Sequence, residues 1–275
     1  MTRLAQLSDL HFGSEDPATV DALVEHLNSL ALDLVILSGD LTMAARRDEF
    51  ERARRFIERL DAPALSVPGN HDVTPYHLIE RFTRPWARWR RYVSAELEPD
   101  WSGEGVAVVG INTARRLRLG LDWSHGSVSR GQMKALAKRF GRASEPFRIV
   151  VAHHPFLEEV GADLSGRPRI MVRRAEAALG AFAQLRVDLV VGGHLHRTYA
   201  STFDAATPGG SSHRVTVIQA GTALSSRTRN EPNAFNLIEV DRGQLSVTAV
   251  MWGDGAWERQ SDPLAVLSKP LGDQG

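Results

Sequence analysis

The chain has 275 residues, of which 43% are hydrophobic and 24% are charged, and its formal net charge is zero. This composition is typical of a soluble globular protein with a sizeable core, and the balanced charge excludes a global attraction to nucleic acid or membrane. The absence of cysteine excludes disulfides, thiolate metal ligands and a cysteine nucleophile. Without a recognisable signal peptide or an apolar run of roughly 18 residues, the sequence predicts a cytoplasmic protein.

Short apolar runs alternate with helical patterns over the first two-thirds of the chain. We expect strands at 4–7, 34–37, 65–67, 106–111, 149–151 and 189–191, and helices at 17–30, 48–60, 130–140 and 174–185. Beyond Tyr199, strands at 215–218, 235–240 and 245–251 follow one another without a helix. This order predicts an α/β fold of two sheets packed face to face with helices outside, in one domain over 1–260, and a loose tail over 261–275.

A helical insertion is predicted at about 73–100. Apolar side chains recur on one face at Ile79, Phe82, Trp86 and Trp89, and arginines recur on the other at Arg81, Arg84, Arg88 and Arg91. Pro85 should kink this segment or start a second helix. The simplest interpretation is a cap packed on the sheet with a solvated arginine face.

Two functional interpretations of the insertion are alternatives to a purely structural cap. Arginines of the segment, together with those after Asn112, could grip an anionic substrate near a catalytic centre. The candidates are Arg81, Arg84, Arg88, Arg115 and Arg116. Alternatively, the segment 76–92 could contact an anionic membrane.

Five separate strand ends finish in residue types that bind metals. They are Asp9-Leu10-His11, Gly39-Asp40, Gly69-Asn70-His71-Asp72, His153-His154-Pro155 and Gly193-His194-Leu195-His196. In an extended chain, residues i and i+2 point to the same side, so each of the first and last motifs can present two ligands to one site. A mixed set of carboxylates, amide oxygen and imidazoles suits Mn, Fe, Zn or Co, and it exceeds what one ion would take. Two ions that share a carboxylate explain the surplus.

The order of these motifs resembles that of the calcineurin-like metallophosphoesterase family, over about residues 4–200. The closest resemblance is to its bacterial branch of cyclic-nucleotide and glycerophosphodiester phosphodiesterases. It implies a four-layer αββα sandwich and two bound ions, Mn²⁺ and/or Fe²⁺/Fe³⁺, with Zn²⁺ also compatible. In that pattern Asp40 bridges the ions, the first ion is held by Asp9, His11 and His196, and the second by Asn70, His153 and His194. Family alignment favours His153 over His154.

The resemblance also implies a mechanism and a substrate class. A hydroxide between the two ions would attack a small phosphodiester, while His71 protonates the leaving oxygen or stabilises the transition state. One alternative is a pyrophosphatase that acts on a nucleotide-linked lipid precursor at the membrane surface. The best-known branch with that activity carries arginine where this chain has His71.

A second alternative is a non-catalytic scaffold, in which gaps in the set of ligands would be expected; the sequence has none. Binding to duplex nucleic acid is not expected, because no extended basic stripe is present. A homodimer could form through the insertion or the terminal strands.

Overall fold

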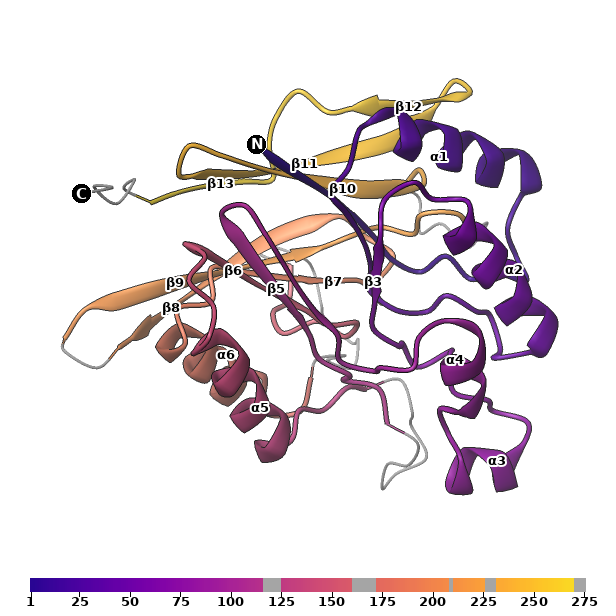
Figure 1. The fold of residues 1–275 in the computed structure, drawn as a ribbon, viewed down its shortest axis with the longest axis horizontal. Helices are drawn as coiled ribbons and strands as arrows, with labels where there is room; N and C mark the ends of the chain where they lie inside the picture. The colour runs from indigo at the N-terminus through magenta and orange to yellow at the C-terminus, as the bar shows by residue number, and fades with distance from the viewer. Residues whose placement is uncertain (116–124, 160–171, 208–209, 226–230, 270–275) are drawn as a thin grey trace.

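The structure is a computed structural model that describes residues 1–115, 125–159, 172–207, 210–225 and 231–269. Its strands form two mixed sheets (Figure 1). The first sheet has the order β12 (Ala256–Arg259), β11 (Gln244–Gly253), β10 (Ala234–Asp241), β1 (Thr2–Leu7), β2 (Leu34–Leu37) and β3 (Ala64–Ser66), with β13 (Ala265–Ser268) paired to β11. The second has the order β4 (Asp100–Gly103), β5 (Val106–Gly110), β6 (Phe147–Val151), β7 (Leu189–Gly192), β9 (Ser212–Gln219) and β8 (Tyr199–Ala206).

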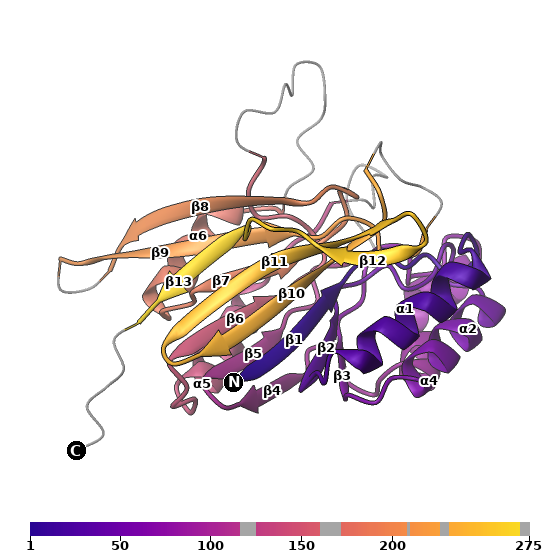
Figure 2. The ribbon, with the colours of Figure 1, turned by 90° about the horizontal axis from the view of Figure 1, so that it is seen from above.

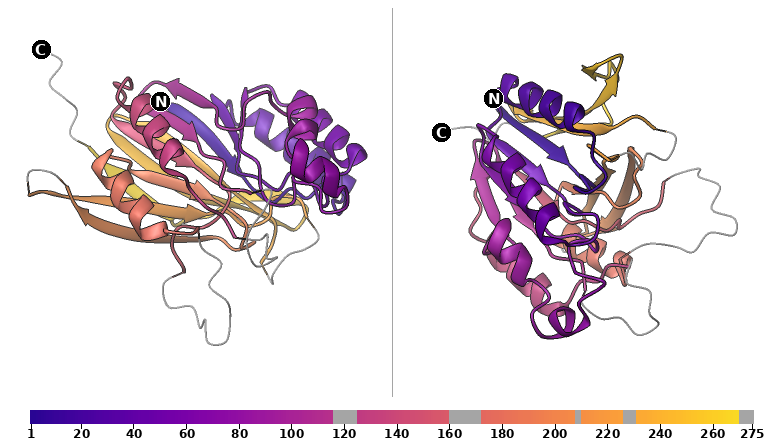
Figure 3. Two further views of the ribbon diagram at one scale, coloured as in Figure 1. Left: turned by 90° about the horizontal axis from the view of Figure 1, so that it is seen from below. Right: turned by 90° about the vertical axis from the view of Figure 1, so that its right-hand side faces the viewer.

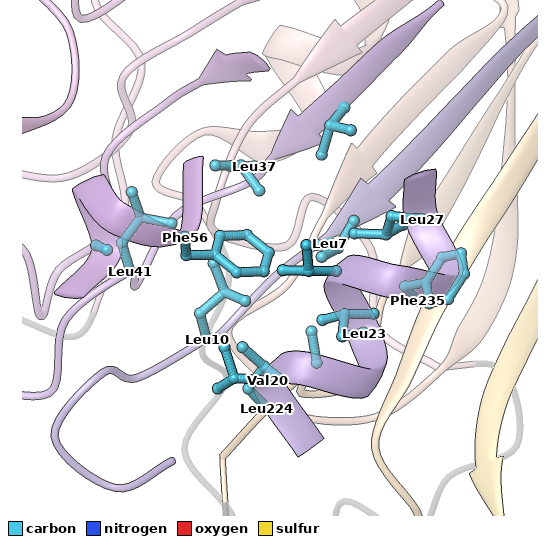
Figure 4. Close-up of a cluster of buried hydrophobic side chains, with 14 of the residues drawn as sticks. Leu7, Leu10, Val20, Leu23, Leu27, Leu37, Leu41, Phe56, Leu224 and Phe235 are labelled. Carbon is cyan, nitrogen blue, oxygen red and sulfur yellow. The ribbon is translucent and has the colours of Figure 1, made fainter. Parts of the chain in front are cut away.

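Helices cover the outer faces of both sheets. They are α1 (Pro17–Ser29) and α2 (Arg47–Glu58) on the first sheet, and α5 (Arg130–Phe140) and α6 (Ala175–Gln184) on the second. Figure 2 shows the first sheet from above with α1 and α2 at its side, and the right-hand view of Figure 3 shows α1 in indigo on the opposite side from α5 and α6. Beneath α1 and α2, Leu23 and Phe56 pack near Leu7 and Leu37 of the sheet (Figure 4). This arrangement confirms the predicted four-layer αββα sandwich.

Alternate residues of the central strands face two different layers. In β2, Leu34 and Ile36 pack between the sheets, whereas Val35 and Leu37 pack beneath α1 and α2. Strand β6 alternates in the same way between the inter-sheet layer and the layer under α5 and α6. Because both faces are buried, these strands appear in the sequence as uninterrupted apolar runs.

The parallel strands bring five loops together. β1, β2 and β3 are parallel to one another, and so are β5, β6, β7 and β9. Backbone hydrogen bonds join the loops that follow these strands, including those from Asp9 N–H to Gly39 O at 3.1 Å and from Gly193 N–H to His153 O at 2.9 Å. The carboxyl ends of parallel strands are where an α/β sheet usually places its functional groups.

The insertion folds into two short helices, α3 (Leu78–Thr83) and α4 (Ala87–Tyr92), with Pro85 between them as predicted. Trp89 is fully buried against the layer of α1 and α2, but Ile79 is 84% exposed and Phe82 is 40% exposed. The expectation that one continuous apolar face would contain all of these residues is therefore wrong. The break at Pro85 lets α4 turn its apolar side inward while α3 keeps part of its apolar side outward.

The C-terminal tail also differs from the prediction. Ala265–Ser268 forms β13 and pairs antiparallel with β11, where Leu267 lies opposite Leu245. Leu264 and Leu267 pack against the inter-sheet core, so apolar contacts hold a segment that was expected to be loose. Residues 270–275 of the predicted tail lie outside the described residues. No helix in the described part of the chain combines the length and apolar character needed to cross a bilayer.

Candidate metal centre

Five of the seven residues predicted to bind metal have left-handed backbones, whereas Asn70 and His153 do not. The φ angles are 53° at Asp9, 48° at His11, 51° at Asp40, 76° at His194 and 57° at His196. The sequence-based expectation of an extended backbone at these motifs is therefore wrong, although the side chains do converge. A left-handed non-glycine residue costs on the order of 1–3 kcal/mol and persists only where its surroundings enforce it, as functional sites often do.

The first cluster consists of Asp9, His11 and His196, from the loops after β1 and β7. Asp9 Oδ1 lies 3.2 Å from His196 Nε2 and 3.6 Å from His11 Nε2. The two Nε2 atoms lie 3.2 Å apart. All three side chains are buried, and their ligand atoms converge on one point.

The second cluster gathers side chains from four loops around His153. Its Nε2 lies 3.2 Å from Asn70 Oδ1, 3.2 Å from Asp40 Oδ2 and 3.2 Å from His194 Nδ1. Its other nitrogen, Nδ1, lies 2.9 Å from the carbonyl of Ser38. A hydrogen bond from Nδ1 to that carbonyl would direct the Nε2 lone pair toward the other three groups, which is the usual arrangement for a metal-binding histidine.

The spacing within both clusters fits metal coordination. Metal–ligand bonds of about 2.1 Å meeting at right to tetrahedral angles place neighbouring ligand atoms roughly 3.0–3.4 Å apart. The clusters adjoin, since ligand atoms of Asp9, Asp40 and His153 all lie within 4.8 Å of one another. Asp9 Oδ1 is buried and accepts no hydrogen bond from the described residues. A cation at each cluster would satisfy these donor sets, and a carboxylate could serve both.

Two glycines permit this convergence. A Cβ at Gly193 would overlap the Ser8 hydroxyl, and one at Gly39 would lie 2.6 Å from His153 Nδ1. Gly39 also has a φ of +94°, which side chains disfavour. The loops can approach one another this closely only without side chains at these positions.

The buried carboxylates and imidazoles of the two clusters shift one another's pKa values. Burial opposes ionisation of Asp9, but the imidazoles of His11 and His196 beside its carboxylate leave its pKa well below the usual range. Burial alone would lower the pKa of His153, but the carboxylates of Asp40 and Asp9 raise it to about 9. Burial and the positive potential of His153 lower the pKa of His194 to about 3. The carboxylates therefore favour positive charge at the centre of the site, which a metal ion can supply.

His71 lies at the edge of the first cluster. Its ring centroid is 4.9 Å from that of His11, with the two rings nearly perpendicular. Its Nδ1 lies 2.6 Å from the carbonyl of Met43, and its backbone N–H donates to Asp40 Oδ1 at 2.8 Å. A hydrogen bond from Nδ1 to the Met43 carbonyl leaves Nε2 as the nitrogen that can exchange a proton with a substrate.

Asp72 directly follows His71 in the motif Gly69-Asn70-His71-Asp72. It is buried, and its carboxylate accepts hydrogen bonds from the backbone N–H groups of Gly69, Leu41 and Thr42 and from the Thr42 hydroxyl. Burial and the nearby charge of Asp40 raise its pKa to about 6. Asp72 therefore joins the loop that carries Asp40 to the loop that carries His71.

His154 lies behind the second cluster. Its Nδ1 is 2.8 Å from the Thr113 hydroxyl, and its ring centroid is 4.8 Å from that of His194. Burial holds its pKa well below the usual value, so the ring is neutral. His153 is the histidine placed between Asp40 and Asn70. Ring nitrogens of His153, His154 and His194 also lie within 4.8 Å of one another, so the choice of His153 over His154 as a ligand stays a prediction.

Two of the candidate substrate arginines are held by contacts within the cap. Arg81 is only 2% exposed and donates to the carbonyls of Val73 and Thr74, each at 3.1 Å. Arg88 donates to the Glu80 carboxylate at 2.8 Å and to a backbone carbonyl at 2.6 Å. These contacts fasten α3 and α4 to the loops beside the site.

The remaining candidates differ in their surroundings. Arg115 donates to the hydroxyl and carbonyl of Ser127 and to the side chain of Gln132, and it joins the loop after β5 to α5. Arg84 is exposed and forms no ion pair with any described residue. Arg116 lies outside the described residues. A role for these arginines in substrate binding stays a prediction, and Arg84 is the one classed as exposed among the four that the structure describes.

The two-sheet frame and the two adjoining clusters define the metallophosphoesterase class of proteins. The chain belongs to the calcineurin-like phosphoesterase family, whose family model matches residues 2–198. The family resemblance predicted from the motifs is therefore confirmed.

Similar proteins support the same assignment. The "Probable cyclic nucleotide phosphodiesterase" of Synechococcus sp. is 27% identical over 207 residues, which cover 71% of this chain and 74% of the relative. The "Probable glycerophosphodiester phosphodiesterase GpdQ" of Arcobacter nitrofigilis is 23% identical over 231 residues, which cover 77% and 79%. Purple acid phosphatase PPD1 from yellow lupin shares the fold: it superposes with a TM-score of 0.68 at 15% identity, covering 98% of this chain and 54% of that structure. The chain is thus a metal-dependent phosphoric ester hydrolase by family, as predicted.

Proposed function

We propose that the protein hydrolyses a small phosphodiester with two metal ions. Asp9, His11 and His196 would hold one ion, and Asn70, His153 and His194 the other, with Asp40 shared between them. The observation that supports this most directly is the position of His153 Nε2, 3.2 Å from ligand atoms of Asp40, Asn70 and His194. Mn²⁺ and Fe²⁺/Fe³⁺ suit this mixture of oxygen and imidazole groups, and Zn²⁺ is also compatible.

The chain's own residues divide the remaining work. When bound, the two ions would lower the pKa of a water molecule and neutralise charge on the phosphoryl group. His71 would give a proton from Nε2 to the leaving oxygen, or donate a hydrogen bond to it as charge develops. The Met43 carbonyl, 2.6 Å from His71 Nδ1, keeps that ring oriented. Asp72 holds the two loops that carry Asp40 and His71.

Phosphodiesters are the favoured substrates because two similar proteins are named as phosphodiesterases, one for cyclic nucleotides and one for glycerophosphodiesters. The proposal for this chain is a small diester of either kind.

The test is hydrolysis by purified protein loaded with Mn²⁺. We expect release of p-nitrophenol from bis(p-nitrophenyl) phosphate, loss of that activity with a chelator and recovery with added metal. Cyclic nucleotides, glycerophosphodiesters and p-nitrophenyl phosphate, assayed side by side, would then rank diesters against a monoester. Protein that carries two tightly bound ions but turns over neither diesters nor monoesters would overturn the proposal and favour a scaffold.

A further inference from the structure

The most exposed apolar side chains of the described residues concentrate on the cap. Tyr76 is 67% exposed, Leu78 is 52%, Ile79 is 84% and Phe82 is 40%. Only Met1 and Val266 are other large apolar residues with comparable exposure among the described residues. Clustered apolar exposure of this kind is typical of a surface that meets another molecule or a membrane. We call these four residues the α3 patch.

Arginines surround the α3 patch. Arg47 and Arg84 line, with Tyr76, Leu78 and Ile79, one open depression of about 900 Å³. Arg46, whose side chain is 63% exposed, forms an ion pair with Glu49 at 3.9 Å and lies with its guanidinium carbon 5.9 Å from the centre of the Tyr76 ring. Within the described residues, neither Arg47 nor Arg84 forms an ion pair.

The acidic residues nearby do not cancel this positive charge. Asp48 pairs with Arg52 at 2.9 Å, and Glu80 is held by Arg88 at 2.8 Å. Arg47 and Arg84 are therefore left to interact with anions outside the protein. An apolar surface bordered by unpaired cations is complementary to a bilayer that carries anionic lipids.

The α3 patch also lies near the loops that flank His71. A second depression, of about 400 Å³, is lined by Ala44, Thr74, Tyr76 and His77. Ala44 follows the residue whose carbonyl approaches His71, and Thr74 lies three positions after His71. A surface that docks on the α3 patch would come close to the catalytic side of the molecule.

We propose that the α3 patch docks the protein on the surface of an anionic lipid membrane. Leu78 and Ile79 would enter the region between headgroups and acyl chains, while Arg47 and Arg84 contact lipid phosphates. A second copy of the chain fits this surface less well, because a two-fold interface centred on the patch would bring arginines of both copies together. The proposal does not depend on which phosphoester the enzyme hydrolyses.

The test is sedimentation of the full-length, Mn²⁺-loaded protein with lipid vesicles. One set of vesicles contains phosphatidylglycerol in phosphatidylcholine, and the other contains phosphatidylcholine alone. Leu78→Ser combined with Ile79→Ser removes the apolar contacts, and Arg47→Gln combined with Arg84→Gln removes the charges. The matched controls are Val266→Ser on β13, where Val266 is 50% exposed, and Arg242→Gln, where the side chain of Arg242 is 88% exposed.

We expect the protein to bind the anionic vesicles more strongly than the neutral ones, and less strongly as salt rises. The apolar double variant should bind about tenfold more weakly, and each arginine removed should weaken binding about fivefold. The two control variants should bind as the parent does. Circular dichroism and thermal melting of every variant exclude misfolding as the cause.

Three outcomes would overturn the proposal. The first is equal binding to anionic and neutral vesicles, or none to either. The second is undiminished binding by both double variants. The third is a concentration-dependent dimer, measured by analytical ultracentrifugation, that the apolar double variant abolishes while vesicles bind no protein. That last result would assign the α3 patch to self-association.

Discussion

The carboxylate of Asp72 accepts hydrogen bonds from the backbone N–H and from the hydroxyl of Thr42, each at 2.9 Å. Thr42 lies two residues after Asp40, and Asp72 lies directly after His71. The same carboxylate accepts the N–H of Gly69 at 2.9 Å, in the loop that carries Asn70. One buried side chain thus fixes the distance between two loops that both contribute to the metal centre.

Replacing Asp72 with asparagine should loosen both loops. An amide offers one acceptor oxygen in place of two and turns donor hydrogens toward the N–H groups that Asp72 now accepts. We expect the free energy of unfolding to fall by about 1–3 kcal/mol and metal affinity to fall about 10–100-fold. Urea denaturation and competition with a metal chelator measure the two effects. Asp204→Asn, at a half-exposed carboxylate on β8, is the control; equal values for both variants would contradict the linking role.

The residues predicted from the sequence as metal ligands lie together in the structure, but the way the backbone presents them was not predicted. The spacing of Asp9 with His11 indicated a shared site, because strand ends and metal-binding residue types can be recognised in a short stretch of sequence. The left-handed backbones could not be read in this way, since they depend on hydrogen bonds between loops far apart in the chain. The anchoring role of Asp72 depends on Thr42 from another loop, and nothing in its own motif indicates that contact.

The cap was the least predictable part for a related reason. Helical periodicity grouped Ile79 with Trp89, and Arg81 with Arg84. In the structure Trp89 and Arg81 are buried, while Ile79 and Arg84 are exposed. Periodicity gives the relative directions of side chains within one helix, but it cannot give the angle between two short helices separated by a proline.

His71→Gln should slow hydrolysis without removing the metal ions. The loss should depend on the leaving group, because an acid helps most when the departing oxygen is a poor leaving group. For a glycerophosphodiester we expect kcat to fall by about 10²–10⁴-fold, and much less for bis(p-nitrophenyl) phosphate. Parallel assays on both substrates, with metal content measured on the same samples, provide the comparison. His77→Gln, at an exposed histidine before α3, should change neither rate; an equal loss on both substrates would argue against proton donation by His71.

Asp40→Asn should reduce metal content and hydrolysis together. Asp40 Oδ2 lies 3.2 Å from His153 Nε2. In the proposed centre Asp40 is shared by both ions, so its charge is needed to keep two cations close to one another. We expect bound metal to fall below two ions per chain. Hydrolysis should fall by at least about 100-fold, which is the upper end of the loss caused by replacing a residue that only hydrogen-bonds to a metal ligand. Elemental analysis after gel filtration gives the metal content. Asp21→Asn, at a surface carboxylate that is 71% exposed, should retain both ions; a fully loaded and active Asp40→Asn protein would remove Asp40 from the shared position.

Metal affinity should rise with pH because of His153. Burial disfavours its charge, but Asp40 and Asp9 raise its pKa to about 9 in the metal-free protein, so Nε2 holds a proton at neutral pH. That proton must leave before a metal binds, whereas His194, with a pKa lowered to about 3, has none to release. The apparent affinity for Mn²⁺ should therefore increase about tenfold per pH unit between pH 6 and 9 and then level off. Calorimetry in buffers of different ionisation enthalpy should count about one proton released. Affinity that is flat across this range would mean that metal binding displaces no proton from His153.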